Sequence, residues 1–500
     1  MLPDDVLLEI FHIYVIEGPS AFEGFRCLSE FGVNQGWITL AHLCRRWRSV
    51  VFQSQRRLDL RLLCTYKTPA RDTLDVWPPL PLIIQDPYGI PYHWNDTSGA
   101  DNIIAALEHN DRVCQIDLCR LTSSPLEYVA GSAAMQKPFP ELIHLRLEMY
   151  EYGPKPILPD SFLGGTAPRL QSLILDGISF PRLPKLLLSA THLVDLSLPN
   201  IPRSGYFPPD AMATSLSAMT SLESLRLNFR YPRPRPALEN RRPPPPPLTR
   251  FILPHLTKIQ FKGVSEYLEE ILARIDAPRL DELEITFFNQ IIFDTPQLFQ
   301  FISRRPTLRA PERGRIKFGP GAIYVGFLSQ TSQYDIVLSV GILCTTSEWR
   351  LSSLEQICTS SLPPLSTLEV LYIHGDGRHL PHWQDDFDNT LWLDLLRSFV
   401  AVKSLYLTKK SVSHIAPALQ ELVGGRTAEV LPTLENIFLE GFQPSGPLYE
   451  GIEKFVVARQ LTSHRSPCNR FSLGSLARAR LLERDMIRNY PSLSVSLLYM

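Results

Sequence analysis

A short apolar motif recurs along most of this chain and limits the folds that the chain can adopt. The motif is apolar-x-x-apolar-x-apolar, and its first seven copies begin at residues 113, 142, 170, 193, 222, 256 and 280. Successive starts are 29, 28, 23, 29, 34 and 24 residues apart, close to the roughly 20–29 residues of a repeat that contributes one strand to a stack. After a gap, further copies begin at 368, 402 and 434. The spacing predicts a stack of similar units.

Proline marks the start of several copies of this motif. The prolines that stand two residues before a first apolar position are Pro140, Pro168, Pro254, Pro278 and Pro432. Proline cannot continue a preceding helix and favours a turn into a strand. Stretches with helical periodicity lie between the copies, for example at 266–275, 391–400 and 415–423. Each unit is therefore predicted as helix, turn and short strand, stacked with parallel strands on one side and helices on the other.

Residues 286–365 interrupt the period. The strands predicted there are Ile316–Phe318, Ala322–Phe327 and Ile336–Ile342, and a helix is predicted over Glu348–Cys358. The pattern fits two degenerate repeats or an inserted hairpin, and the sequence leaves both open.

The segment before the first motif copy combines one alternating run with a loop-like stretch. Leu58, Leu60 and Leu62 alternate as in a strand, so the first strand of the solenoid is expected near 58–62. Residues 65–98 are rich in proline and aromatic side chains and are predicted to form a connecting loop.

Two amphipathic stretches lie within the first fifty-two residues. The first stripe is Val6, Leu7, Ile10, Phe11 and Tyr14, and the second is Leu40, Leu43, Cys44, Trp47 and Val51. Both follow helical spacing. Pro3 suits the first turn of a helix, and Asp4 and Asp5 favour its positive end. These short helices can form only a small core. We therefore expect a partner to cover their remaining apolar surface.

The residues of these two stripes resemble the F-box. Leu2-Pro3 precedes an acidic and aliphatic helix ending at Ile10-Phe11, and a second helix carries Cys44-Arg45-Arg46-Trp47. The spacer at 17–36 is longer than the family's usual link. The resemblance implies an all-α F-box over residues 1–55 that docks onto the Skp-type adaptor of an SCF ubiquitin ligase and, through it, onto a cullin. The adaptor-binding residues that it implies are Leu2, Pro3, Val6, Leu7, Ile10, Phe11, Leu40, Leu43, Cys44 and Trp47.

The repeats resemble the irregular leucine-rich repeats that follow F-boxes in a large fungal family. The Asn or Cys of the stricter repeat pattern is mostly missing here. The resemblance implies an α/β fold, with the F-box followed by a curved leucine-rich-repeat-like solenoid over 56–460 that has parallel strands on its concave face. Residues 461–500 are predicted as a C-terminal helical cap, because an apolar helical stripe runs through residues 476–486 and solenoid ends need capping.

The last x of each motif points away from the core, towards the expected concave face. These positions are Arg146, Ile174, Ser197, Arg226, Gln260, Glu284, Tyr372, Tyr406 and Phe438. The last three are aromatic, so we predict that their rings stack on adjacent strands and contact a target protein, with Arg226 and Glu284 marking a charged region. The alternative is that the C-terminal segment covers these rings.

Bulk composition excludes several classes of function. The chain has 500 residues, 44% hydrophobic and 20% charged, with a net charge of −1, so nothing attracts nucleic acid or anionic lipid strongly. The eight cysteines form no Cys-x-x-Cys pair, which argues against a disulfide framework or zinc module. No apolar run approaches the ~18 residues of a membrane span, and acidic residues stand where a signal peptide needs basic ones. A cytoplasmic or nuclear location is expected.

No motif for catalysis or for a cofactor is recognisable. The densest set of potential metal ligands is His374, His379, His382, Asp385, Asp386 and Asp388. Their spacing fits no known zinc motif, so no metal and no cofactor are expected. The proline-rich segment 231–247 favours polyproline II and could bind an SH3 or WW domain, but a loop between repeats is the favoured interpretation.

These patterns together predict a non-catalytic substrate-receptor subunit of an SCF-type ubiquitin ligase. The alternative is a non-degradative scaffold that assembles partners without presenting a substrate. A hydrolase hidden in the solenoid is a more distant alternative, because no His, Cys or Ser has a neighbour in the sequence that identifies a catalytic partner.

Overall fold

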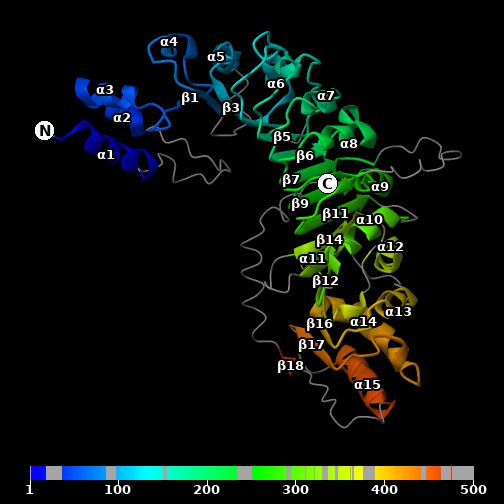
Figure 1. Cartoon of the computed structure of the whole chain (residues 1–500). Helices are drawn as coiled ribbons and strands as arrows, with labels where there is room; N and C mark the ends of the chain where they lie inside the picture. The colour runs from blue at the N-terminus through cyan, green and yellow to red at the C-terminus, as the bar shows by residue number, and fades with distance from the viewer. Residues whose placement is uncertain are drawn as a thin grey trace. The chain divides into compact units, whose positions relative to one another are not determined.

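The computed structural model (Figure 1) divides into two compact units, each with its own part of a β-sheet. The first unit is Met1–Tyr231 with Phe251–Leu256, and the second is Pro232–Arg250 with Thr257–Met500. The structure describes residues 2–17, 36–85, 97–149, 155–232, 250–288, 294–309, 311–319, 321–328, 336–343, 347–360, 362, 365–375, 389–440, 446–462 and 474–475. The predicted domain boundaries at 55 and 460 stay predictions.

Three helices open the first unit: α1 (Asp4–Glu17), α2 (Gly36–Leu43) and α3 (Arg45–Gln53). The apolar stripe from Leu40 to Val51 is divided between two helices, because the chain breaks between α2 and α3. Cys44 has an extended backbone (φ −158°, ψ 165°), and its Sγ accepts a hydrogen bond from the Trp47 N–H at 3.4 Å. The residue before a helix often satisfies a free N–H in this way, so Cys44 starts a new helix.

Aromatic contacts hold these helices together and join them to the following chain. The ring of Trp47 lies 4.8 Å from that of Phe11. Trp37 packs edge-on against Trp77 at 5.5 Å, and its indole N–H donates to the carbonyl of Arg61 at 3.2 Å. Because Arg61 immediately precedes the first strand, Trp37 ties α2 to the start of the sheet.

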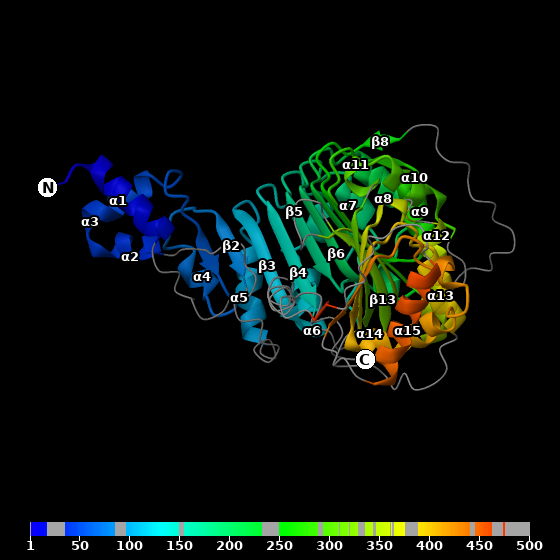
Figure 2. The ribbon, with the colours of Figure 1, turned by 90° about the horizontal axis from the view of Figure 1, so that it is seen from below.

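The sheet of the first unit is entirely parallel. Its strands are, in order, β1 (Leu62–Cys64), β2 (Leu82–Gln85), β3 (Val113–Leu121), β4 (His144–Met149), β5 (Ser172–Asp176), β6 (Asp195–Ile201) and β7 (Ser224–Phe229). The connections carry α4 (Ala70–Thr73), α5 (Thr97–Leu107), α6 (Ser123–Gly131), η2 (Phe162–Gly165), α7 (Leu183–Leu187), η3 (Arg203–Gly205) and α8 (Pro209–Ser217). The short strand β8 (Phe251–Ile252) also belongs to this unit. The helices cover one face of the sheet (Figure 2), and we call the other the open face.

Two predictions for the start of this sheet are wrong. The first strand is Leu62–Cys64, whereas Leu58 and Leu60 are buried in a turn in which Asp59 has φ 46°. A turn can bury alternate residues as a strand does, so the alternation was misleading. The predicted loop over 65–98 contains α4 and the buried strand β2. That strand reads as a continuous apolar run between prolines, without the alternation used to find strands.

The motif leucines of the first unit form the predicted core. Leu145, Leu173, Leu196 and Leu225 occupy matching positions on β4 to β7 and are at most 2% exposed. The backbone repeats as well. The carbonyl of Ile143, just before β4, accepts N–H groups from the two residues that lead into β5, and the same arrangement recurs between later repeats. Successive repeats are therefore stacked in equivalent positions.

The sheet of the second unit is parallel except around one strand. The order is β9 (Lys258–Gly263), β11 (Glu282–Phe288), β14 (Ile336–Leu343), β13 (Ala322–Leu328), β12 (Arg313–Gly319), β15 (Val370–Gly375), β16 (Ser404–Thr408), β17 (Asn436–Glu440) and β18 (Gly474–Ser475). Strand β13 runs antiparallel to both β12 and β14, while β11 and β15 pair parallel with their neighbours. The three strands predicted in the irregular region are confirmed, and they form an inserted antiparallel meander.

Helices connect the strands of the second unit. They are α9 (Ser265–Leu272), α10 (Pro296–Ser303), α11 (Pro306–Arg309), α12 (Ser347–Ser360), η5 (Leu365–Thr367), α13 (Asn389–Arg397), α14 (Lys409–Gln420), η6 (Thr427–Glu429) and α15 (Pro447–Thr462). A two-residue strand, β10 (Ile275–Asp276), follows α9. Leu283, Leu371, Leu405 and Ile437 continue the buried motif positions and are at most 2% exposed.

Candidate functional site

Helix α1 presents a row of exposed apolar side chains. They are Leu2 (51% exposed) just before the helix, then Val6 (42%), Ile10 (46%), Ile13 (54%) and Tyr14 (39%). We call this row the α1 apolar face. Each member lies three or four residues from another member, so they lie on one side of the helix. A contiguous apolar patch at the surface marks an interaction site more often than scattered exposed residues do.

The ten residues predicted to bind an adaptor separate into a buried group, an exposed group and three residues with local contacts. Leu7, Phe11 and Leu40 are at most 5% exposed and build the core between the helices. Leu2, Val6, Ile10 and Leu43 are exposed and available to a partner. Pro3, Cys44 and Trp47 have local roles: the Pro3 carbonyl accepts the Leu7 N–H at 3.1 Å, Cys44 caps α3, and Trp47 packs on Phe11.

Ile13 belongs to the α1 apolar face and was missed in the sequence. It lies three residues after Ile10, and this helical spacing could have revealed it.

Arg46 fixes the start of α1 against α3. Its guanidinium donates to the Asp4 carboxylate at 2.6 Å and also to the backbone carbonyl of Leu2. The side chains of Arg46 and Asp4 are 37% and 60% exposed, so the pair adds little to stability. It does fix the position of Leu2 at one end of the α1 apolar face.

Three rings stack on adjacent strands of the second unit, as predicted. Tyr372 on β15 lies opposite Tyr406 on β16, which lies opposite Phe438 on β17. The ring centroids are 4.6 and 4.4 Å apart, and the planes differ by 23° and 15°. All three side chains are partly exposed. We call this row the ring ledge.

The alternative that a C-terminal cap covers the rings falls mostly outside the described residues. Of residues 461–500, the structure describes the end of α15 and strand β18. Strand β18 pairs parallel with β17 and places Gly474 opposite Phe438. Whether a helical cap follows stays a prediction.

A basic strand lies directly beside the ring ledge. On β12, Arg313, Arg315 and Lys317 alternate with Gly314, Ile316 and Phe318, of which Ile316 and Phe318 are buried in the core. Side chains alternate between the faces of a strand, so the three cations lie on the opposite face of the sheet from Ile316 and Phe318, which we call the open face of the second unit. We call β12 the basic strand. Sequence reasoning missed this feature, although the alternation of basic and core residues in 313–318 could have indicated it.

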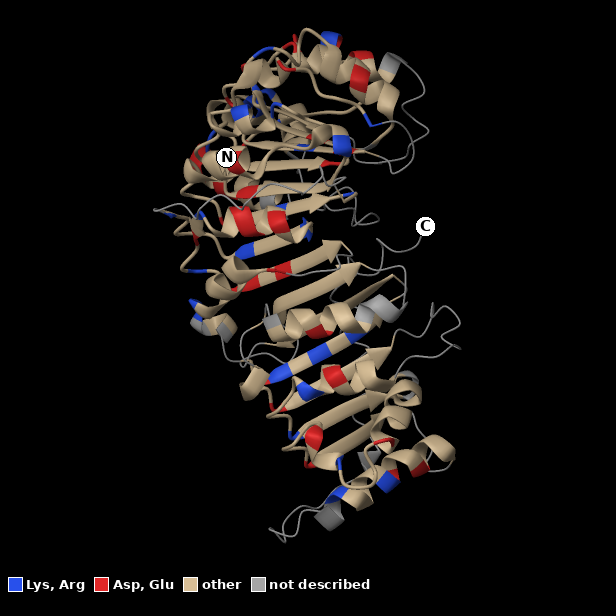
Figure 3. Ribbon diagram, turned by 90° about the vertical axis from the view of Figure 1, so that its right-hand side faces the viewer, with Lys and Arg blue, Asp and Glu red and all other residues tan. Residues whose placement is uncertain are grey.

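The β15 residues opposite the basic strand add no negative charge to it. Arg315 lies opposite Tyr372, and Lys317 lies opposite His374. Burial, with further contributions from Arg315 and Lys317, lowers the pKa of His374 to about 3, so His374 is neutral near pH 7. Figure 3 marks the basic positions of β12 in blue and the acidic positions of β11 in red.

The two charged residues predicted to accompany the rings have local partners. Glu284 on β11 accepts a hydrogen bond from Gln260 on β9 at 2.6 Å. Arg226 on β7 belongs to the first unit, where its charge favours the ionised form of Asp176. A role in target binding stays a prediction for both.

Asp176 on the first unit has a carboxyl group with a raised pKa. It ends β5 and accepts a hydrogen bond from the Asn200 side chain at 2.8 Å. Burial raises its pKa to about 6, with Glu148 adding to the effect and Asn200 opposing it. The folded state therefore holds this proton more tightly than the unfolded chain does.

This shift predicts a pH dependence of stability. The pKa of Asp176 is higher in the folded state than in the unfolded chain. The stability that protonated Asp176 contributes to the fold is therefore fully present below about pH 4 and is lost as the pH rises through about 6. Asp176→Asn should flatten the plot of the free energy of unfolding against pH between about pH 4 and pH 6. Urea unfolding of the full chain at several pH values in this range gives the measurement. Asp75→Asn, at an exposed position of the same unit, is the control and should leave the curve unchanged. An unchanged slope in Asp176→Asn would contradict the assignment.

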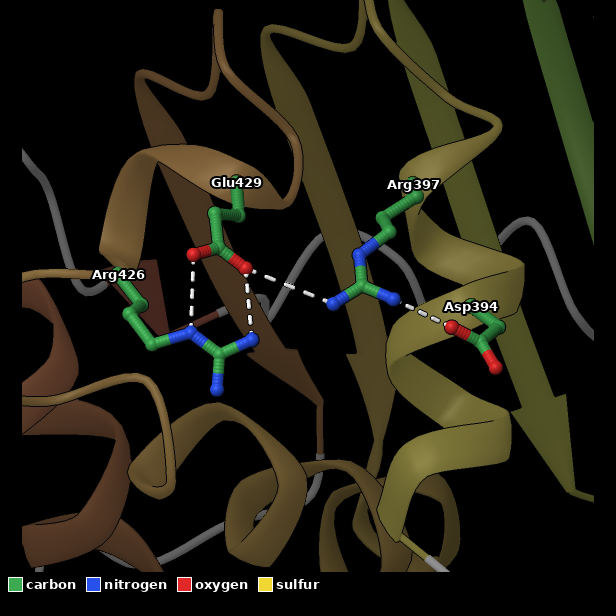
Figure 4. A network of polar contacts seen from close by, with 4 residues as sticks. All are labelled: Asp394, Arg397, Arg426 and Glu429. Atoms are coloured by element: carbon green, nitrogen blue, oxygen red, sulfur yellow. Dashed lines mark hydrogen bonds and ion pairs between the residues drawn. The ribbon is translucent and has the colours of Figure 1, made fainter.

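An exposed ion-pair network joins two consecutive repeats of the second unit (Figure 4). Arg397 on α13 pairs with Asp394 and reaches Glu429 on η6 at 3.5 Å, while Arg426 donates two hydrogen bonds of 2.9 Å to Glu429. The hydrogen bonds from Arg426 are the main reason that the pKa of Glu429 is lowered. The charges in this network already have partners, so it is a weaker candidate for binding than the basic strand.

The described residues show no group of three or more His, Cys, Asp or Glu side chains placed to hold a metal ion. Of the six potential ligands named in the sequence, only His374 is described. The proline-rich segment also lies almost wholly outside the described residues. None of the described helices is long and apolar enough to cross a lipid bilayer.

Comparison with known proteins adds little to this structural account. No family model and no curated protein matches the chain. Among solved structures, the chain is similar to the leucine-rich repeat-containing protein LegL7 from Legionella pneumophila, at 12% identity over 82% of this chain and 100% of that chain, with a TM-score of 0.25. So weak a likeness carries no argument. The leucine-rich-repeat-like architecture rests on the parallel strands and buried leucines of this chain.

Proposed function

We propose that this chain is a substrate-receptor subunit of an SCF-type ubiquitin ligase. Helices α1 to α3 would form the F-box and bind a Skp-type adaptor, and the sheet units would bind a target protein. The observation that carries the proposal is the α1 apolar face, exposed beside Leu2-Pro3 and Cys44-Arg45-Arg46-Trp47, the residues that resemble the F-box. An apolar face of this kind needs a partner surface to cover it.

In this proposal the chain performs no chemistry itself and uses no cofactor. The adaptor links it to a cullin, and the cullin carries the ubiquitin-loaded enzyme. The chain would hold the target close to that enzyme, and proximity alone can supply a large part of a rate enhancement. A cytoplasmic or nuclear location fits this role.

Calorimetric titration of the full chain with a purified Skp-type adaptor tests the proposal. We expect a one-to-one complex whose formation has a negative heat-capacity change, because apolar surface is buried. The absence of binding would contradict the F-box assignment. An adaptor complex that does not recruit cullin would instead favour the non-degradative scaffold.

A further inference from the structure

The basic strand and the ring ledge form one continuous row on the open face of the second unit. Arg315 lies opposite Tyr372, which begins the ledge that continues through Tyr406 to Phe438. Four adjacent strands therefore place one cation and three rings side by side. With neighbouring strands ~4.8 Å apart, the backbones of β12 and β17 are about 14 Å apart. That span suits a short peptide segment lying across the strands.

The charge of this row calls for an anionic partner. Within the part of the chain that the structure describes, neither Arg313 nor Lys317 forms an ion pair with a carboxylate. Their register partners on β15, Val370 and His374, bring no negative charge. The acidic strand β11 has its own local contacts, since Glu282 pairs with Lys258 at 2.9 Å. Arg313 and Lys317 can therefore attract and orient a negatively charged ligand.

The geometry of the rings favours a peptide over single-stranded nucleic acid. A base stacks on an exposed ring face, but the rings of Tyr372, Tyr406 and Phe438 already stack on one another at 4.6 and 4.4 Å. Stacked rings present their edges outward. Ring edges carry partial positive charge, so they suit carbonyl and carboxylate oxygens, and their carbon atoms suit apolar side chains. Both kinds of group are abundant in a peptide.

We propose that the row formed by the basic strand and the ring ledge binds a peptide segment that carries an acidic group a few residues from an apolar side chain. The acidic group, a carboxylate or a phosphate, contacts Arg313, Arg315 and Lys317, and the apolar side chain lies on the rings. An extended peptide advances ~3.3 Å per residue, and β12 and β16 are about 10 Å apart, so about three residues separate the two groups. That the peptide belongs to a ligase target rests on the proposed function.

Selection from a displayed library of random short peptides tests this proposal with the full chain as bait. We expect the enriched peptides to carry Asp or Glu roughly two to four residues from an aromatic or large aliphatic residue. One enriched sequence is then synthesised with Glu, phosphoserine or Gln at the acidic position. Fluorescence anisotropy should show that Gln weakens binding about tenfold or more. The tighter of the other two identifies the source of the negative charge.

Matched variants locate the binding surface. Arg313→Gln/Lys317→Gln should weaken binding of the Glu or phosphoserine peptide about tenfold or more, and added salt should reduce the difference from the unmodified chain. Arg279→Gln/Lys454→Gln removes two exposed cations from elsewhere in the same unit and should leave binding unchanged. Tyr372→Ala/Tyr406→Ala should also lose binding. Because that change can disturb packing, the basic-strand variant decides the case.

Three outcomes would overturn the proposal. The first is a selection without enrichment of acidic residues, and the second is full binding by Arg313→Gln/Lys317→Gln. The third is that the full chain binds a labelled single-stranded RNA of mixed sequence more tightly than the peptide, and that Arg313→Gln/Lys317→Gln abolishes this binding. The ligand of the row would then be a nucleic acid. Adaptor titration of the same samples separates this inference from the proposed function. If the chain binds the peptide but no adaptor, the proposed peptide-binding surface stands and the proposed ligase role fails.

Discussion

Leu196→Ala is expected to lower the free energy of unfolding of the first unit by about 2–5 kcal/mol, the usual cost of removing a large core side chain. Leu196 is fully buried in β6, between Leu173 on β5 and Leu225 on β7. Each repeat is supported by its neighbours, so the cavity weakens contacts on both sides. Urea unfolding of the full chain, followed by circular dichroism, gives the measurement.

Leu188→Ala is the matched control for this experiment. Leu188 is the same residue type in the same unit, but it follows α7 and is 48% exposed. Its replacement should change the free energy of unfolding by no more than about 0.5 kcal/mol. Equal effects of the two substitutions would mean that the motif leucines are not the core of the repeat.

Val6→Asp/Ile10→Asp is expected to weaken binding of a Skp-type adaptor by at least about 30-fold, or roughly 2 kcal/mol. Both side chains lie on the α1 apolar face, and an adaptor that covers this face would have to desolvate two unpaired carboxylates. Because the positions are 42% and 46% exposed in the free chain, the fold should tolerate the change. Calorimetric titration measures the affinity, and circular dichroism checks the helices.

Ser49→Asp/Gln53→Asp controls for the added charge. It places the same two carboxylates four residues apart at exposed positions of α3. This variant should bind the adaptor nearly as tightly as the unmodified chain. If both double variants lose binding equally, repulsion between charges explains the loss, and the α1 apolar face has no special role.

The strand architecture could be predicted from the sequence because one position in each motif is buried without exception. Leu173, Leu196, Leu225 and Leu283 all lie in parallel strands and are at most 2% exposed. The start of the sheet could not be predicted equally well. Strand β2 is a short apolar run between prolines, and such a run lacks the alternation that marks a half-exposed strand.

The ring ledge was also predictable, because identical positions in consecutive repeats place side chains side by side. The basic strand was not predicted, since β12 belongs to the antiparallel insertion and does not follow the motif. Only the pairing of β12 with β15 reveals that Arg315 lies beside Tyr372. The break between α2 and α3 lies at Cys44, whose backbone is extended, but the apolar spacing of the sequence continues across it and gives no sign of the break.

Size-exclusion chromatography with light scattering, on a mixture of the full chain, a Skp-type adaptor and a cullin, tests whether the chain joins an SCF-type complex. We expect a single complex that contains all three proteins, and we expect the chain and the cullin to elute separately when the adaptor is omitted. Elution of the chain apart from the adaptor–cullin complex at micromolar concentrations would contradict its role as a receptor subunit.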